Sequence, residues 1–80
     1  MGVDLSTFLR QQGLTQEDAA EGAGLSQSTV SRICAREREP LAETADRLVA
    51  WAERVAARRR IPVRRRLDRS EVRATPERAA

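Results

Sequence analysis

Apolar residues recur at helical spacing along most of the chain, and no strand-like alternation occurs in residues 1–58. The first apolar group occupies positions i, i+3 and i+4 and comprises Leu5, Phe8 and Leu9. Asp4 stands where it can cap the N-terminus of a helix, and Gly13 stands where it can end that helix after Gln12. The pattern predicts a first helix between these two residues.

A second helix is predicted from Gln16 to about Ala23. Thr15 can cap it, and Asp18, three residues later, approximates a capping box. The apolar side of this helix consists of small residues, namely Ala19, Ala20 and Ala23. A neighbouring helix can therefore approach it closely.

Gly24 is expected to end the second helix, because a left-handed residue is least strained without a Cβ atom. Ser26 is a strong N-cap for a third helix, from which Val30 and Ile33 point inward. The sequence thus predicts two short helices joined by a tight turn.

A fourth helix is expected to carry Pro40 in its first turn, and Pro62 is expected to stop it by about Arg60 or Ile61. Its apolar stripe is predicted to be Leu41, Ala45, Leu48, Ala52 and Val55. We expect a domain of residues 1–57 followed by an arginine-rich extension of residues 58–80. A short extended segment is predicted around Ile61, Val63 and Leu67, and a mobile end from Asp68 to Ala80.

The net charge also changes between the helical part of the chain and the segment that follows it. The 15 basic residues are all arginine, and the net charge is +3. Residues 1–53 carry five arginines and nine acidic residues, a net charge of −4. Residues 54–80 carry ten arginines and three acidic residues, a net charge of +7. A mildly acidic helical part therefore precedes a strongly basic segment.

Length and composition exclude several classes of function. Eighty residues form one domain, which is too small for a large enzyme core with a deep pocket. The chain lacks histidine and has one cysteine, Cys34, so we expect no catalytic residues, disulfide, metal or cofactor. With neither a membrane-spanning apolar run nor the apolar core of a signal peptide, we expect a cytoplasmic protein.

The spacing within residues 16–33 matches a helix-turn-helix. Counted from Gln16, an alanine at the fifth position lies where the helices touch, and a glycine at the ninth lies where the chain reverses. The tenth, fifteenth and eighteenth positions are inward and apolar, being Leu25, Val30 and Ile33. Because packing requires each residue type, the joint match is more specific than any single residue.

On these residues, and on Gly13–Glu17 and Arg38–Pro40, the chain resembles the lambda-repressor-like, Cro-type helix-turn-helix family, also called XRE. The resemblance covers roughly Leu5 to Val55. It implies an all-α bundle of four to five helices, here followed by a basic tail. It also implies a homodimer that binds double-stranded operator DNA and places its third helix in the major groove.

The resemblance implies base contacts by four residues of the third helix, namely Gln27, Ser28, Thr29 and Arg32. Glutamine suits the N6/N7 edge of adenine, and arginine suits the O6/N7 edge of guanine. It implies phosphate contacts, which set register rather than read sequence, by Gln16, Ser26, Ser31, Arg36, Arg38 and Arg10.

The chain departs from the family after Ile33, where an acidic residue, a polar residue and a glycine are usual. It has Cys34, Ala35 and Arg36 instead, so the end of the third helix and the following loop do not follow from the resemblance. Cys34 is interpreted as a small, partly buried filler, with redox sensing as the alternative.

Two features keep alternatives open. Trp51 is either a core residue or an aromatic anchor at a dimer interface. The arginine-rich extension is a nonspecific phosphate arm, a dimerisation segment or a disordered end. The candidate dimerisation residues are Trp51, Val55, Ile61, Val63 and Leu67.

These features favour a DNA-binding transcriptional regulator, more specifically a repressor that binds a palindromic operator as a homodimer. An alternative is an antitoxin whose tail folds onto a toxin partner, although residues 68–80 offer only Val72 and alanines as apolar anchors. A third is a nonspecific nucleic-acid binder in which the tail does most of the binding.

Overall fold

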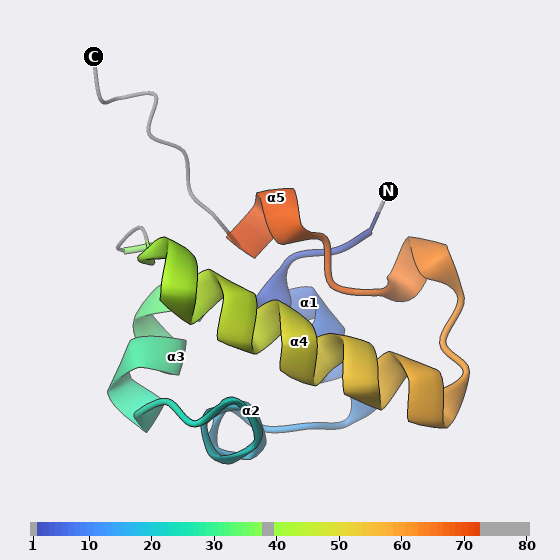
Figure 1. Cartoon of the computed structure of the whole chain (residues 1–80), viewed down its shortest axis with the longest axis horizontal. Coiled ribbons are helices and arrows are strands. Elements are labelled where there is room, and N and C mark those ends of the chain that lie inside the picture. The colour runs from blue at the N-terminus through green and yellow to red at the C-terminus, as the bar shows by residue number, and fades with distance from the viewer. Residues whose placement is uncertain (1, 38–39, 73–80) are drawn as a thin grey trace.

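A long helix, α4 (Ala42–Arg59), runs across three shorter ones in the computed structural model (Figure 1). The structure describes residues 2–37 and 40–72. Within them the other elements are α1 (Leu5–Gln12), α2 (Gln16–Ala23), α3 (Gln27–Cys34), a 3-10 turn η1 (Val63–Arg65) and α5 (Arg69–Val72). The all-α fold expected from the sequence is confirmed.

The first three helices begin at the expected caps. The Asp4 carboxylate accepts a hydrogen bond from the Thr7 N–H at 2.9 Å. At α2, the Thr15 hydroxyl and the Asp18 carboxylate each accept from the other residue's N–H, which completes the capping box. The Ser26 hydroxyl accepts from an N–H of the first turn of α3. Each cap satisfies a backbone donor that the helix itself leaves free.

Glycines end α1 and α2 as predicted. Gly13 has φ +68° and Gly24 has φ +72°, so both adopt the left-handed conformation that terminates a helix. The Leu25 N–H then donates to the Ala20 carbonyl at 2.8 Å, which closes the turn between α2 and α3.

The hydrophobic core draws on every helix. Phe8, Val30 and Leu48 are fully buried, and the small residues of α2 are buried with them. The buried set is Leu5, Phe8, Leu9, Ala19, Ala20, Ala23, Val30, Ile33, Ala45, Leu48, Val49, Trp51, Ala52, Ala56, Ile61, Leu67 and Val72. Three of these residues lie beyond residue 60, so the extension contributes to the same core.

Trp51 lies inside this core. Its ring meets the Phe8 ring edge to face, with centroids 6.1 Å apart and planes at 81°. Its indole also rests directly on Gly22 of α2, where a Cβ atom would overlap the ring. Of the two interpretations left open for Trp51, the structure supports the core residue.

The segment after α4 folds back onto the residues that precede α1. Val3 and Leu67 form an isolated parallel bridge, in which Val3 N–H donates to the Arg66 carbonyl and Asp68 N–H to the Val3 carbonyl, both at 2.9 Å. Residues 61–72 therefore belong to the folded body, although the sequence suggested a boundary after residue 57. The rest of the expected mobile end, residues 73–80, lies outside the described residues.

The start of α4 differs from the prediction. Pro40 precedes the helix instead of lying in its first turn, and Leu41 is an N-cap that has no side-chain hydrogen bond. Because the N-cap backbone is extended, Leu41 leaves the apolar stripe and is 76% exposed. The helix ends after Arg59, close to the expected stop. None of the helices in the described part of the chain has the length and apolar composition needed to cross a membrane.

The Gly22–Trp51 contact gives a stability test. Gly22→Ala should lower the free energy of unfolding by about 1–3 kcal/mol, because the added methyl group overlaps the buried indole. Alanine is otherwise favoured over glycine within a helix by roughly 1 kcal/mol. Urea denaturation measures the change, and Glu21→Ala, at an exposed neighbouring position, should shift stability by less than about 0.5 kcal/mol. A more stable Gly22→Ala variant would refute the contact.

Candidate nucleic-acid interface

Helices α2 and α3 form the helix-turn-helix unit that the spacing predicts. Small side chains line the buried side of α2, so α3 can pack closely against it. Val30 and Ile33 are the buried residues of α3. Because only this side of α3 is needed for packing, its opposite side is free to meet a ligand.

The candidate base-contacting residues lie mostly on that opposite side. Gln27, Ser28 and Arg32 are exposed, and so is Ser31, which was predicted to contact phosphate. The structure therefore brings four of the predicted residues to one surface of α3. The term reading face is used below for these four residues.

Hydroxyl groups cluster at the N-terminus of α3. The Ser26 and Thr29 hydroxyls lie 2.8 Å apart, and the Ser26 and Ser28 hydroxyls lie 3.4 Å apart. Thr29 is half-buried, and its hydroxyl is engaged by the cap. Ser26 is thus first a structural cap, at a helix end whose N–H groups favour anions.

Gln16 and Arg10 lie beside the end of α3. They line one shallow hollow between α1 and the start of α2, together with Cys34. Burial raises the pKa of the Cys34 thiol, and a hydrogen bond from Gln16 only partly offsets this. The thiol is therefore poorly ionised at neutral pH, which fits a filler better than a reactive cysteine. Two predicted phosphate contacts, Arg10 and Gln16, are brought together here.

Arg36 occupies the position where the family usually has glycine. Its backbone is left-handed, with φ +59°. Its guanidinium lies 2.7 Å from the Glu71 carboxylate and 3.6 Å from that of Asp4. Hydrogen bonds from Thr7, and to a smaller extent the charge of Arg36, hold the pKa of Asp4 below its usual range. The Arg36 guanidinium, which was predicted to contact a phosphate, is therefore paired with two carboxylates. Arg38, another predicted phosphate contact, lies outside the described residues.

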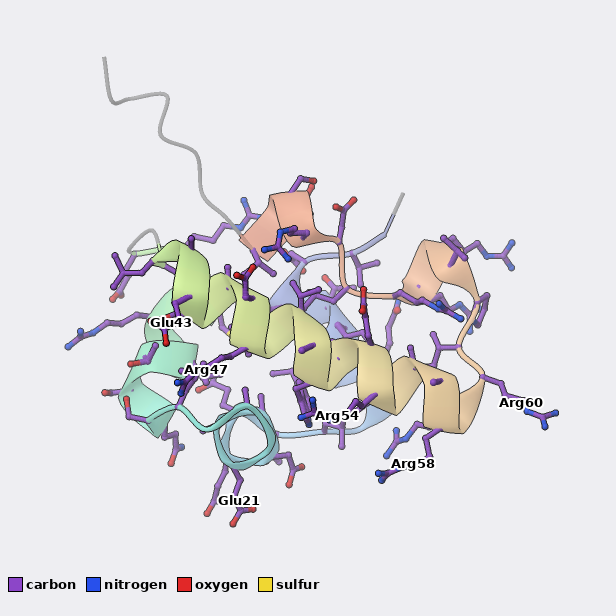
Figure 2. The ribbon with its side chains drawn as sticks, viewed as in Figure 1. Glu21, Glu43, Arg47, Arg54, Arg58 and Arg60 are labelled. Carbon is purple, nitrogen blue, oxygen red and sulfur yellow. The ribbon has the colours of Figure 1, made fainter. Side chains whose placement is uncertain are left out.

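Arginines of α4 bind the helix-turn-helix, a role that was not predicted from the sequence. Arg47 donates to the Gly24 carbonyl at 3.3 Å, and Arg54 donates to the Gly22 carbonyl at 3.1 Å (Figure 2). Both acceptors lie at the C-terminal end of α2, where helix carbonyls lack partners. The seven-residue spacing of the two arginines, which places them on one face of α4, was the available signal.

The candidate dimerisation residues are placed differently from one another. The chain's own core covers Trp51, Ile61 and Leu67. Val55 is half-buried against that core. Val63 is 65% exposed and is the member of this set that presents most of its surface.

A family model described as "Helix-turn-helix" matches residues 5–50. The matched range contains α1, α2 and α3 and the first half of α4, which is more than half of the 80 residues. No curated protein and no solved structure matches the chain.

Substitutions at Arg36 test the strained loop that follows α3. Arg36→Ala loses both ion pairs and keeps a Cβ atom on a left-handed backbone, whereas Arg36→Gly loses the ion pairs but relieves the backbone. A left-handed residue with a Cβ costs roughly 1 kcal/mol. Because an exposed ion pair contributes about 0.2–1 kcal/mol, Arg36→Gly should stay within about 1 kcal/mol of wild type.

Arg36→Ala should be about 1 kcal/mol less stable than Arg36→Gly in urea denaturation. Equal stability of the two variants would contradict a left-handed backbone at this position.

Proposed function

The chain belongs to the Cro- and lambda-repressor-like (XRE) helix-turn-helix family of DNA-binding transcriptional regulators, and we propose that it is a repressor that binds a palindromic operator as a homodimer. The observation that carries the proposal is the reading face of α3, Gln27, Ser28, Ser31 and Arg32, exposed on a helix whose other side is anchored by Val30.

The four residues of α3 that are expected to contact bases have distinct chemical roles in this proposal. The Gln27 amide both donates and accepts, which suits adenine, and the Arg32 guanidinium forks onto guanine. Ser28 hydrogen-bonds to either type of base edge. The Thr29 hydroxyl is engaged by Ser26, so its methyl group is the part that contacts a thymine methyl.

Phosphate contacts would set the register of α3 in the groove. Gln16 and Arg10 share one hollow beside the end of α3. Ser26 precedes the base-contacting residues, and Ser31 lies next to Arg32 among them. Arg36 can join them only by exchanging the Glu71 carboxylate for a phosphate. These contacts add affinity that falls with rising salt concentration.

Repression would follow from occupancy of the promoter and needs no catalytic step. One helix-turn-helix contacts about one half of the operator. A two-fold dimer places its two recognition helices about 34 Å apart, which is one turn of DNA. The antitoxin alternative gains no support from the described residues. Val72, the large apolar anchor that residues 68–80 offered, is buried in the chain's own core.

Sequence preference tests the role of the reading face. Selection from a random duplex library with the full chain should yield a preferred site. Gln27→Ala combined with Arg32→Ala should lower the preference for that site over random duplex by about 100-fold, because each base contact contributes roughly 1–3 kcal/mol of discrimination. Competition binding at physiological salt measures the ratio.

A matched control removes the same residue types elsewhere. Gln11→Ala combined with Arg69→Ala, both at exposed positions outside α3, should leave the preference intact. Unchanged preference in the Gln27/Arg32 variant would contradict the assignment of α3.

Stoichiometry tests the homodimer. Sedimentation should find two chains on a duplex that carries the whole palindrome. A duplex carrying half of it should be bound more weakly, because one α3 of the dimer then has no half-site. A single chain on the full palindrome, at saturating protein, would contradict the dimer.

A further inference from the structure

Two non-glycine residues in the described part of the chain have a left-handed backbone, and both are arginines that follow a helix. Arg36 has φ +59°, and Arg60, which ends α4, has φ +54°. Glycine is the usual residue at such ends because a Cβ atom is strained there. Arg36 gains ion pairs to Glu71 and Asp4 from its position. Arg60 has no such acceptor within the described residues, so the fold does not explain why an arginine stands at this strained position.

The arginines of residues 54–72 fall into two groups. One group binds acceptors within the chain: Arg54 binds the Gly22 carbonyl, Arg59 the Gln12 carbonyl, Arg66 the Ile61 carbonyl, and Arg69 the Asp46 carboxylate. The other group is exposed and has no ion pair or hydrogen-bond acceptor among the described residues; it consists of Arg58, Arg60, Arg64 and Arg65. These four residues are called the arginine end below.

The arginine end is part of the folded body. The Arg66 side chain donates to the Ile61 carbonyl at 2.8 Å, and the Arg65 N–H donates to the Pro62 carbonyl at 2.9 Å. These bonds close a tight turn whose Ile61 is buried in the core. The guanidinium groups therefore project from an ordered platform, and Arg60 points away from the molecule (Figure 2).

This platform lies at the opposite end of the molecule from the reading face. Helix α4 follows the long axis, with α3 beside its start and η1 beside its end (Figure 1). Its 18 residues span about 27 Å at 1.5 Å per residue. A duplex that holds α3 in its major groove therefore need not reach the arginine end.

We propose that the arginine end is a second phosphate-binding surface, which holds the backbone of a DNA duplex other than the one that α3 reads. This rests on the proposed function, since it assigns α3 to the first duplex. Guanidinium groups bind phosphate bidentately, and four of them without a facing carboxylate among the described residues form a site for a polyanion. The surface carries no base-reading geometry, so its binding is independent of sequence.

Helix electrostatics account for only part of this cluster. Cations near the C-terminus of α4 complement its dipole, which explains Arg58. That effect fades within one turn, so it does not explain Arg64 and Arg65, and it does not require a strained Arg60. A competing occupant is the acidic side of α2 in a second copy, where Glu17, Asp18 and Glu21 are exposed. A duplex carries a denser array of negative charge than these three carboxylates, which favours a duplex as the occupant.

The experiment uses the full chain and two duplexes. The first is immobilised and carries the selected site; the second is labelled, random in sequence and free. The chain should capture the second duplex on the first. A variant with Arg58→Gln, Arg60→Gly, Arg64→Gln and Arg65→Gln should keep its preference for the selected site but capture the labelled duplex at least about 10-fold less. Its salt dependence on random duplex should weaken by about three to four units of slope.

Arg60→Gly alone separates binding from folding. Glycine suits the left-handed position, so the melting temperature should hold or rise while capture of the labelled duplex falls. Gln27→Ala with Arg32→Ala is the reciprocal control: it should lose site preference and keep the salt slope that the arginine end contributes.

Three results would overturn the proposal. The first is equal capture and equal salt slope in the four-arginine variant and wild type. The second is a loss of self-association by the variant, measured without DNA, which would identify a second copy as the occupant. Weakened binding only to a first duplex with long flanks would place the arginines on the same DNA. Absence of any selected site would count against the proposed function instead, and capture between two random duplexes would still test the arginine end.

Discussion

The close approach of α2 to α4, where the Trp51 indole rests on Gly22, is the contact on which the arrangement of the other helices depends. It is possible only because α2 presents small residues and a glycine to its neighbours. The same ring meets Phe8 of α1 edge to face, so one side chain relates three helices. Because α3 packs on α2, this contact also determines where the exposed side of α3 points.

Arginine side chains reinforce this arrangement from α4. Arg47 and Arg54 donate to carbonyls at the end of α2, and Arg59 donates to the Gln12 carbonyl at the end of α1 with a distance of 2.7 Å. Each bond places a positive charge where a helix leaves carbonyl groups without partners. Some of the arginines in the C-terminal third therefore stabilise the fold, and only the others are available to bind an external partner.

Local signals in the sequence predicted the first three helices correctly, because caps and glycine stops act within three or four residues. Features that depend on distant residues were not predictable in this way. The Val3–Leu67 bridge and the Arg36–Glu71 ion pair join segments far apart in the chain. Leu41 matched the period of the α4 stripe, yet an extended N-cap backbone turned it outward. For the interface, helical periodicity placed Gln27 and Arg32 on one exposed side, whereas the carboxylate partners of Arg36 depended on how the chain ends fold back.

We propose that α3 reads the DNA sequence, whereas the arginine end binds phosphate without regard to sequence. Backbone amide chemical shifts of the full chain, recorded with the selected duplex and with a random duplex, test it most directly. The amides of residues 26–32 should respond differently to the two duplexes, while those of residues 60–66 should respond alike to both. Discrimination between the duplexes by residues 60–66, with none by residues 26–32, would contradict it.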